Sequence, residues 1–251
     1  MLPNFTDTSS LIITLTGAFA AGFVTGFAGF GTALVSSGLW FRALAAPLVP
    51  PLMVLSSVVA QFVSLVSVRP DLNWKRVFPF LVSGLVSLPF GILALTYASP
   101  NVLRMTIGAF LIVYSVSQLL GLSNVRIKPR EDFRQDGTIG FFGGFLGGFA
   151  GLSGLLPMIW LRLQGGKSWD QRAIFQPYNL VVLSMASIGM GISGQITMEV
   201  LEIALVCMPL TFAGSFICAR IYKGVSEKLF SRVVLILLFG SGTVLVSQLL
   251  L

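Results

Sequence analysis

Two glycine-rich stretches carry the residue types with which this chain could bind a small anion. They occupy residues 22–34 and 144–156, and at this offset of 122 residues seven of the thirteen positions are identical. A glycine in a helix interior costs about 1 kcal/mol relative to alanine, so glycine at this density needs a structural reason. We expect each stretch to break a helix and to expose backbone N–H groups. A helix N-terminus that begins at such a break favours an anion.

Polar side chains in and near these breaks would supply further hydrogen-bond donors. The hydroxyls of Thr32 and Ser153 lie in the glycine-rich stretches, and one amide lies in the apolar segment that follows the first stretch. Two amides and a phenol lie in the corresponding segment of the second half, beside Pro177. Such donors suit an oxyanion that must be released again, whereas a buried arginine would hold it tightly. The predicted substrate-binding residues are Gly29, Phe30, Gly31, Thr32, Gln61, Gly151, Leu152, Ser153, Gly154, Gln176, Tyr178 and Asn179.

Helix packing is the alternative role for the same residues. Glycines permit close approach of helices in small-xxx-small patterns, and buried amides or hydroxyls bond neighbouring helices for about 0.6 kcal/mol each. The glycine-rich stretch stands at the head of each half of the chain, however, and this duplicated placement favours a binding site.

We recognise no set of catalytic residues in the sequence. The chain has no histidine, and we find no nucleophile–base pair, metal-ligand cluster or phosphate-binding loop. Cys207 and Cys218 lie in one apolar segment and are interpreted as small core residues, not as a disulfide or a metal site. We therefore expect a protein that is not an enzyme and that has no metal and no cofactor.

The composition predicts a polytopic membrane protein built of α-helices. Of the 251 residues 55% are apolar and only 10% are charged, whereas a soluble domain carries roughly 25% charge. Apolar windows of about 20 residues, enough to cross a bilayer, recur along the chain. The net charge of +7 comes from bases in short loops between apolar segments. That distribution is typical of cytoplasmic loops and does not indicate a nucleic-acid partner.

The apolar segments predict two halves of the same design joined by a linker. The halves are residues 1–122 and 138–251, and the linker is residues 123–137. Each half begins with a kinked stretch and continues with three transmembrane helices. In the first kinked stretch the break leaves two arms of about 16 residues, somewhat short for full spans. The kinked stretches are residues 11–45 and 138–161, and the predicted spans are residues 47–68, 77–97, 102–121, 173–192, 198–220 and 229–250.

The distribution of basic residues decides how the two halves are oriented. If each kinked stretch crossed the membrane once, the 16 bases would divide seven to nine. If each stretch enters and returns, as a re-entrant hairpin or a pair of short helices, 14 of the 16 lie on one side, and only Arg42 and Arg104 lie opposite. The second arrangement obeys the positive-inside rule and makes the halves inverted repeats. Both termini are then periplasmic and the linker is cytoplasmic.

Four arginines lie near the ends of predicted spans and have two interpretations. Arg42 and Arg104 lie near the outer ends, and Arg162 and Arg172 flank the second kinked stretch on the cytoplasmic side. All four are interpreted first as anchors that extend to the membrane surface. The alternative is a cytoplasmic vestibule that attracts anions.

The two kinks also resemble the signature stretches of the TauE/SafE family. The resemblance is carried by residues 26–31, residues 148–154 and the pair Leu156-Pro157, and it covers essentially the whole chain. In the first copy Thr32 stands where a further glycine is usual, and Val35 stands where a proline is frequent. The family comprises transporters of sulfite and organosulfur anions, mostly in bacterial inner membranes. The resemblance implies export of sulfite, thiosulfate or a sulfonate such as sulfoacetate, with the anion and the lipid bilayer as partners.

Other functions use the same features. A passive anion channel or an uptake permease for another small organic anion would share the site, and an intramembrane enzyme acting on lipids would need a catalytic constellation. The sequence leaves open which anion is bound, the direction of transport, a coupling proton and the oligomeric state.

Overall fold

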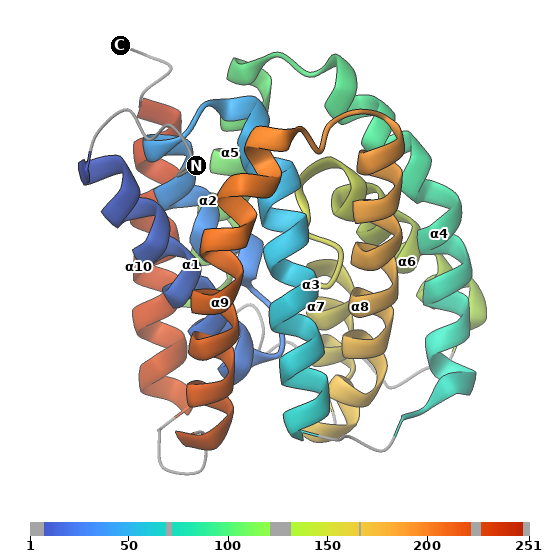
Figure 1. Cartoon of the computed structure of the whole chain (residues 1–251). Coiled ribbons are helices and arrows are strands. Elements are labelled where there is room, and N and C mark those ends of the chain that lie inside the picture. The colour runs from blue at the N-terminus through green and yellow to red at the C-terminus, as the bar shows by residue number, and fades with distance from the viewer. Residues whose placement is uncertain (1–7, 69–71, 121–131, 166, 222–226, 248–251) are drawn as a thin grey trace.

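Helices form every regular element of the described chain (Figure 1). The structure, a computed structural model, describes residues 8–68, 72–120, 132–165, 167–221 and 227–247. The first half contains α1 (Thr8–Ala28), α2 (Thr32–Ala43), the 3₁₀ turn η1 (Ala46–Leu48), α3 (Val49–Val68), α4 (Trp74–Tyr97) and α5 (Pro100–Leu119). The second half contains α6 (Phe133–Ala150), α7 (Leu155–Gln164), α8 (Ser168–Ile192), α9 (Met198–Ile221) and α10 (Glu227–Ser247).

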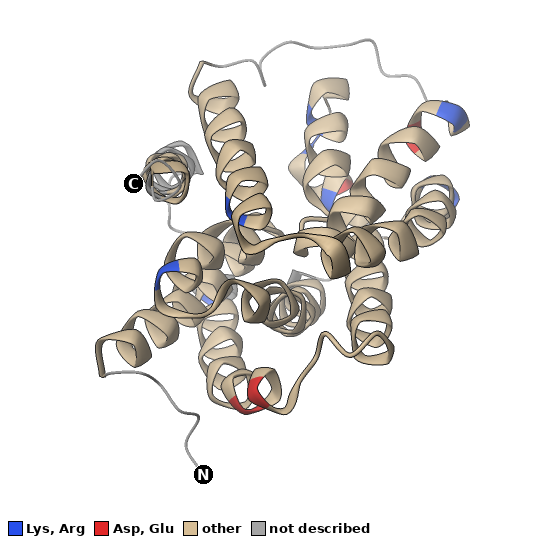
Figure 2. Ribbon diagram, turned by 90° about the horizontal axis from the view of Figure 1, so that it is seen from above, with Lys and Arg blue, Asp and Glu red and all other residues tan. Residues whose placement is uncertain are grey.

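Six of the described helices are long and apolar enough to cross a membrane, namely α1, α3 together with η1, α4, α5, α8 and α9. Figure 2, which colours the charged residues, shows that most of the ribbon carries none. The chain is therefore an all-α, multi-pass membrane protein, as its composition predicts.

The two broken helices divide into a long and a short arm. The arms of the first hairpin, α1 and α2, have 21 and 12 residues, and those of the second, α6 and α7, have 18 and 10. The prediction of two arms of about 16 residues was therefore wrong. The first break lies off-centre, and α2 ends at Ala43 because Leu44 is extended and leads into η1. At about 1.5 Å per residue, α1 alone is long enough to span a bilayer.

The predicted linker and the last span differ from the structure at their edges. Helix α6 begins at Phe133, inside the predicted linker, because Asp132 accepts a hydrogen bond from the Arg134 N–H and caps the helix. Residues 123–131 of the linker, and residues 248–250 of the last predicted span, lie outside the described residues.

The long arm of each hairpin packs on a helix of the other half. The long arm α1 packs on α9, and the long arm α6 packs on α4. In the predicted repeat α1 corresponds to α6 and α4 to α9, so these are the same contact made with the halves exchanged. In Figure 1, α3 descends where α8 ascends, so the last turns of these two helices lie at opposite ends of the bundle. These observations favour inverted repeats, which remain our prediction for the symmetry as a whole.

Glycines at the start of each repeated stretch let these helices approach closely. A Cβ atom at Gly22 would overlap the carbonyl oxygen of Thr211 on α9, and one at Gly144 would overlap that of Gly84 on α4. The glycine four residues later in each arm faces the same neighbouring helix. Close packing is thus the role of this first part of each repeat. The breaks themselves lie further along.

Candidate functional site

The two breaks in the hairpins are built by glycines in the left-handed region of backbone space. Gly29 and Gly31 have φ angles of 79° and 110°, and Gly151 has a φ of 69°. A side chain is strained in this region, so glycine there ends one helix and lets the next begin at a new angle. The breaks also meet, because a Cβ atom at Gly151 would lie 3.7 Å from that of Ala33, in the first turn of α2. The two breaks, which occupy equivalent places in the predicted repeat, therefore come together in space.

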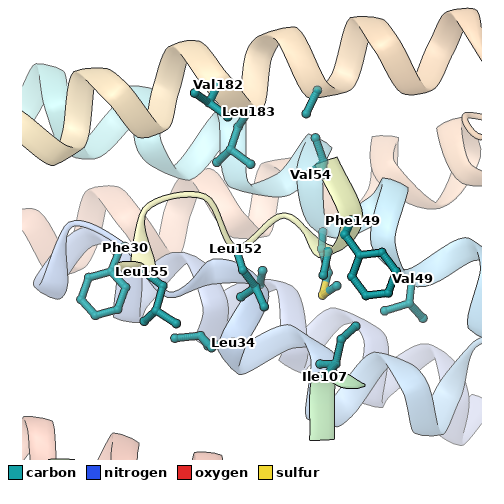
Figure 3. Close-up of a cluster of buried hydrophobic side chains, with 14 of the residues drawn as sticks. Phe30, Leu34, Val49, Val54, Ile107, Phe149, Leu152, Leu155, Val182 and Leu183 are labelled. Carbon is teal, nitrogen blue, oxygen red and sulfur yellow. The ribbon is translucent and has the colours of Figure 1, made fainter. Parts of the chain in front are cut away.

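An inner cavity lies between the two breaks, with about 280 Å³ of empty space when its opening to solvent is included. It is lined by both kinks, by the first turns of α2 and α7, and by residues of α3 and α8. Figure 3 shows Leu34 of α2 beside Leu152 of the second kink, with Phe30 and Leu155 next to each other. The first N–H groups of a helix have no partner within it, and they form the positive end of its dipole. Two helix N-termini thus border one cavity.

Neutral polar groups complete the inner cavity. Asn179 lines it and accepts a hydrogen bond from the Ser153 hydroxyl. Thr32 lines it as well, and its hydroxyl lies 2.6 Å from that of Thr25. Ser57 of α3 is 4% exposed and lines the same space, and its hydroxyl has no hydrogen-bond partner among the described residues. A buried hydroxyl without a partner costs about 1–3 kcal/mol, which a ligand oxygen would recover.

A row of polar side chains continues from Ser57 along one face of α3. Gln61 and Ser64 follow at four and seven residues, the spacing that places side chains on the same helix face. Gln176 of α8 donates its amide N–H to the Ser64 hydroxyl at 3.1 Å, and the same amide packs against Gly29. The Nε2 of Gln61 and the Oε1 of Gln176 are buried and have no partner within the described chain. The row thus leads from the inner cavity to the first kink.

A second and larger cavity, here called the vestibule, adjoins the inner one. It has a volume of about 810 Å³ and shares Phe30, Gly31 and Leu34 with the inner cavity. Arg162 and Arg172 both line it. Arg162 is exposed, whereas Arg172 is 5% exposed and donates to the Phe27 carbonyl in the last turn of α1. The structure therefore brings these two arginines into one cavity, while their interpretation as anchors at the membrane surface stays a prediction.

The family comparison agrees with this architecture. The family model described as "Sulfite exporter TauE/SafE" matches residues 14–245, most of the chain. The chain belongs to the TauE/SafE family. Searches of curated proteins and of solved structures find no match. Membership of the TauE/SafE family confirms the resemblance and implies an exporter-type membrane transporter for sulfite or organosulfur anions.

In this TauE/SafE protein most of the predicted binding residues lie together. Gly29 and Ser153 support the inner cavity through their contacts with Gln176 and Asn179. Gln61 and Gln176 belong to the adjoining polar row. The predicted residues that line the inner cavity are Phe30, Gly31, Thr32, Gly151, Leu152, Gly154 and Asn179.

Tyr178 is the predicted residue that the structure places elsewhere. Its hydroxyl donates to the Gly140 carbonyl at 2.8 Å, and its ring lies edge-on to Phe80 at 6.2 Å. Two residues along a helix correspond to a rotation of about 200°, so Tyr178 points away from the face that carries Gln176. Tyr178 therefore packs against α4 and α6.

Ser57 is not among the residues predicted to bind substrate, and the structure brings it into the inner cavity. The signal that could have found it is its spacing of four residues from Gln61 on the same helix. No group of three or more His, Cys, Asp or Glu side chains that could hold a metal ion occurs among the described residues.

Proposed function

We propose that this protein is a secondary transporter that exports a small sulfur-containing anion across the bacterial inner membrane. The candidates are sulfite, thiosulfate or a sulfonate such as sulfoacetate, and the protein acts on them without chemical change. The observation that carries the proposal is the inner cavity, where α2 and α7 both begin beside buried hydroxyl and amide groups. Transport proceeds by alternating access to this cavity.

Neutral donors suit a site that must release its ligand. None of the described residues that line the inner cavity is charged, so the anion is held by helix N-termini, the Ser57 hydroxyl and the Asn179 amide. Hydrogen bonds from neutral groups are roughly half as strong as those from a guanidinium. An anion bound in this way is stabilised in the membrane interior and still leaves on the transport timescale.

The distribution of bases supports the proposed orientation. The vestibule lies beside the start of α8 and the end of α7, where Arg162, Lys167 and Arg172 cluster. The positive-inside rule assigns that end of the bundle to the cytoplasm. The vestibule is then the cytoplasmic entrance through which an exported anion reaches the inner cavity.

Thermal stabilisation in detergent tests binding. Sulfite, thiosulfate, sulfoacetate, taurine, sulfate and chloride are compared at matched ionic strength, since a ligand at 100 times its Kd adds about 2.7 kcal/mol. We expect one sulfur anion to raise the melting temperature selectively. Ser57→Ala removes one donor and should weaken the binding of that anion about three- to tenfold. Ser184→Ala is the matched control, because that hydroxyl bonds the Leu180 carbonyl within α8. An equal loss of affinity in both variants would show that the inner cavity is not the binding site.

Flux in proteoliposomes separates the transporter from its alternatives. Saturable, trans-stimulated flux of the stabilising anion is the expected result. Flux that rises linearly with concentration would indicate a channel instead. Turnover of a lipid by the purified protein would indicate an enzyme.

A further inference from the structure

The vestibule has a basic side and an apolar side. Its basic side combines Arg162 of α7 with Gln171 and Arg172 of α8. The other lining residues are mostly aromatic and aliphatic, among them Phe27 of α1 and Leu238 of α10, and we call them the apolar side. The vestibule is the larger of the two cavities. The inner cavity, by contrast, is lined by uncharged residues in the part of the chain that the structure describes.

The basic side of the vestibule is suited to hold an anion tightly. Among the described residues that line the vestibule are two arginines, and none of these described lining residues is Asp or Glu. Arg172 is fixed in place by its hydrogen bond to the Phe27 carbonyl, and helix α8 begins at Ser168 on the same wall. Guanidinium groups form the stronger, charge-assisted hydrogen bonds with sulfonate or carboxylate oxygens.

The apolar side of the vestibule has the chemistry to take a hydrocarbon chain. Phe30 and Phe175 lie edge-on with ring centroids 6.2 Å apart, and both line the vestibule. Each methylene buried against such a wall contributes about 0.8 kcal/mol. An inorganic anion uses none of this surface, whereas an anion on a short alkyl chain uses both sides.

We propose that the vestibule is a second binding site, specific for amphipathic organic anions that carry a sulfonate or carboxylate on an apolar chain. Arg162 and Arg172 bind the anionic head, and the chain lies against the wall that includes Phe30. Because Phe30 also lines the inner cavity, a bound chain covers the route to that cavity and inhibits export. The inhibition rests on the proposed function, but the binding does not.

Calorimetry with the full chain in lipid nanodiscs tests the binding. Methane-, butane- and hexanesulfonate are titrated, with empty nanodiscs and neutral hexan-1-ol as controls for partition into lipid. We expect the Kd to fall about three- to fourfold per methylene, hence roughly tenfold from butane- to hexanesulfonate. Equal binding of hexan-1-ol, or no dependence on chain length above the empty nanodiscs, would overturn the proposal.

Arginine variants locate the site. Arg162→Gln changes an exposed residue. It should weaken the binding of hexanesulfonate about tenfold or more, because a charge-assisted hydrogen bond is lost. Arg172→Lys keeps the charge but loses the planar guanidinium, and it should weaken binding as well. Arg42→Gln, at the far end of α2, is the control and should bind as the wild type does. Unchanged affinity in Arg162→Gln and Arg172→Lys would overturn the proposal.

Two further measurements distinguish this site from the inner cavity. Ser57→Ala should leave the affinity for hexanesulfonate unchanged, although it weakens the binding of the transported anion. Hexanesulfonate applied on the vestibule side should inhibit flux in proteoliposomes. Loss of hexanesulfonate binding in Ser57→Ala would place this ligand in the inner cavity and overturn the second site. Binding without inhibition would overturn the claim that the chain covers the route to the inner cavity.

Discussion

The two ends of the inner cavity differ, although the predicted repeat makes them equivalent. At one end the vestibule brings Gln171 and Arg172 of α8 beside open space. At the offset of 122 residues, these two positions correspond to Val49 and Pro50 of α3. There the same part of the repeat carries apolar residues, and its surroundings are packed instead of open.

We call the packed end the plug and define it by Val49, Ile107 and Phe149. These side chains are 0%, 2% and 7% exposed, and they belong to one hydrophobic cluster. Figure 3 shows the Phe149 ring next to Val49, with Ile107 of α5 close by. Opening the plug would expose side chains whose burial contributes about 1.5–3 kcal/mol each. The comparison indicates a conformation in which the vestibule end is open and the plug end closed. The alternating access that we propose requires that the two ends exchange these roles.

Locking the plug is the change with the largest expected effect. Val49→Cys and Phe149→Cys are combined with Cys207→Ser and Cys218→Ser, which remove the two native thiols. A short bifunctional thiol reagent should then abolish flux, because the plug can no longer open. Binding of the transported anion from the vestibule side should persist. Cleaving the cross-link restores flux, and the uncross-linked protein serves as the control. Undiminished flux after complete cross-linking would show that the plug end does not open during transport.

Thiol accessibility at equivalent positions measures how the vestibule end and the plug end differ, without a cross-link. Gln171→Cys and Val49→Cys are compared in the background lacking native thiols. Gln171 lines the vestibule and is partly exposed, whereas Val49 is fully buried. Exposing Val49 costs about 1.5–3 kcal/mol, so its cysteine should react roughly ten- to a hundredfold more slowly with a hydrophilic reagent. In inside-out vesicles Gln171→Cys should react with an impermeant reagent. Equal rates at both positions would remove the distinction between the ends.

The sequence was sufficient for the features that depend on composition and local backbone. Apolar length determines where helices can cross a bilayer, and so α3, α4, α5, α8 and α9 lie close to their predicted spans. The breaks lie at Gly29 and Gly151 because a positive φ there favours glycine. Glycines of the same pattern have two different roles, however. Gly22 and Gly144 do not break a helix but allow close packing against α9 and α4. Only the neighbouring helix reveals which role a given glycine has.

The parts of the site that were missed depend on which distant residues meet. A serine in an apolar helix often bonds its own backbone, as Ser184 does, and nothing local distinguishes Ser57 from it. Tyr178 shows the reverse error, since closeness in sequence to Gln176 does not place it on the same helix face. The vestibule draws its lining from α1, α2, α5, α7, α8 and α10, so folding alone brings it together.

The smallest expected effects concern two tryptophans that join the arms of the hairpins. Trp40 of α2 donates its indole N–H to the Thr14 carbonyl of α1 at 3.0 Å. Trp160 of α7 donates to the buried carboxylate of Asp136 in α6 at 2.8 Å, and Arg76 Nε lies 3.6 Å from the same carboxylate. The first hairpin is thus closed by a neutral bond and the second by a charged one.

The matched variants Trp40→Phe and Trp160→Phe test this difference in unfolding experiments in one detergent. Trp40→Phe should lower the free energy of unfolding by about 0.5–1.5 kcal/mol, the net value of a neutral hydrogen bond. Trp160→Phe should lower it by about 1.5–3 kcal/mol, because its acceptor is ionised and buried. The reverse order would mean that Arg76 alone satisfies Asp136 and that the indole adds little. The charged closure would then stabilise the contact between α4 and α6 instead of the second hairpin, and the two hairpins would be held by unrelated interactions.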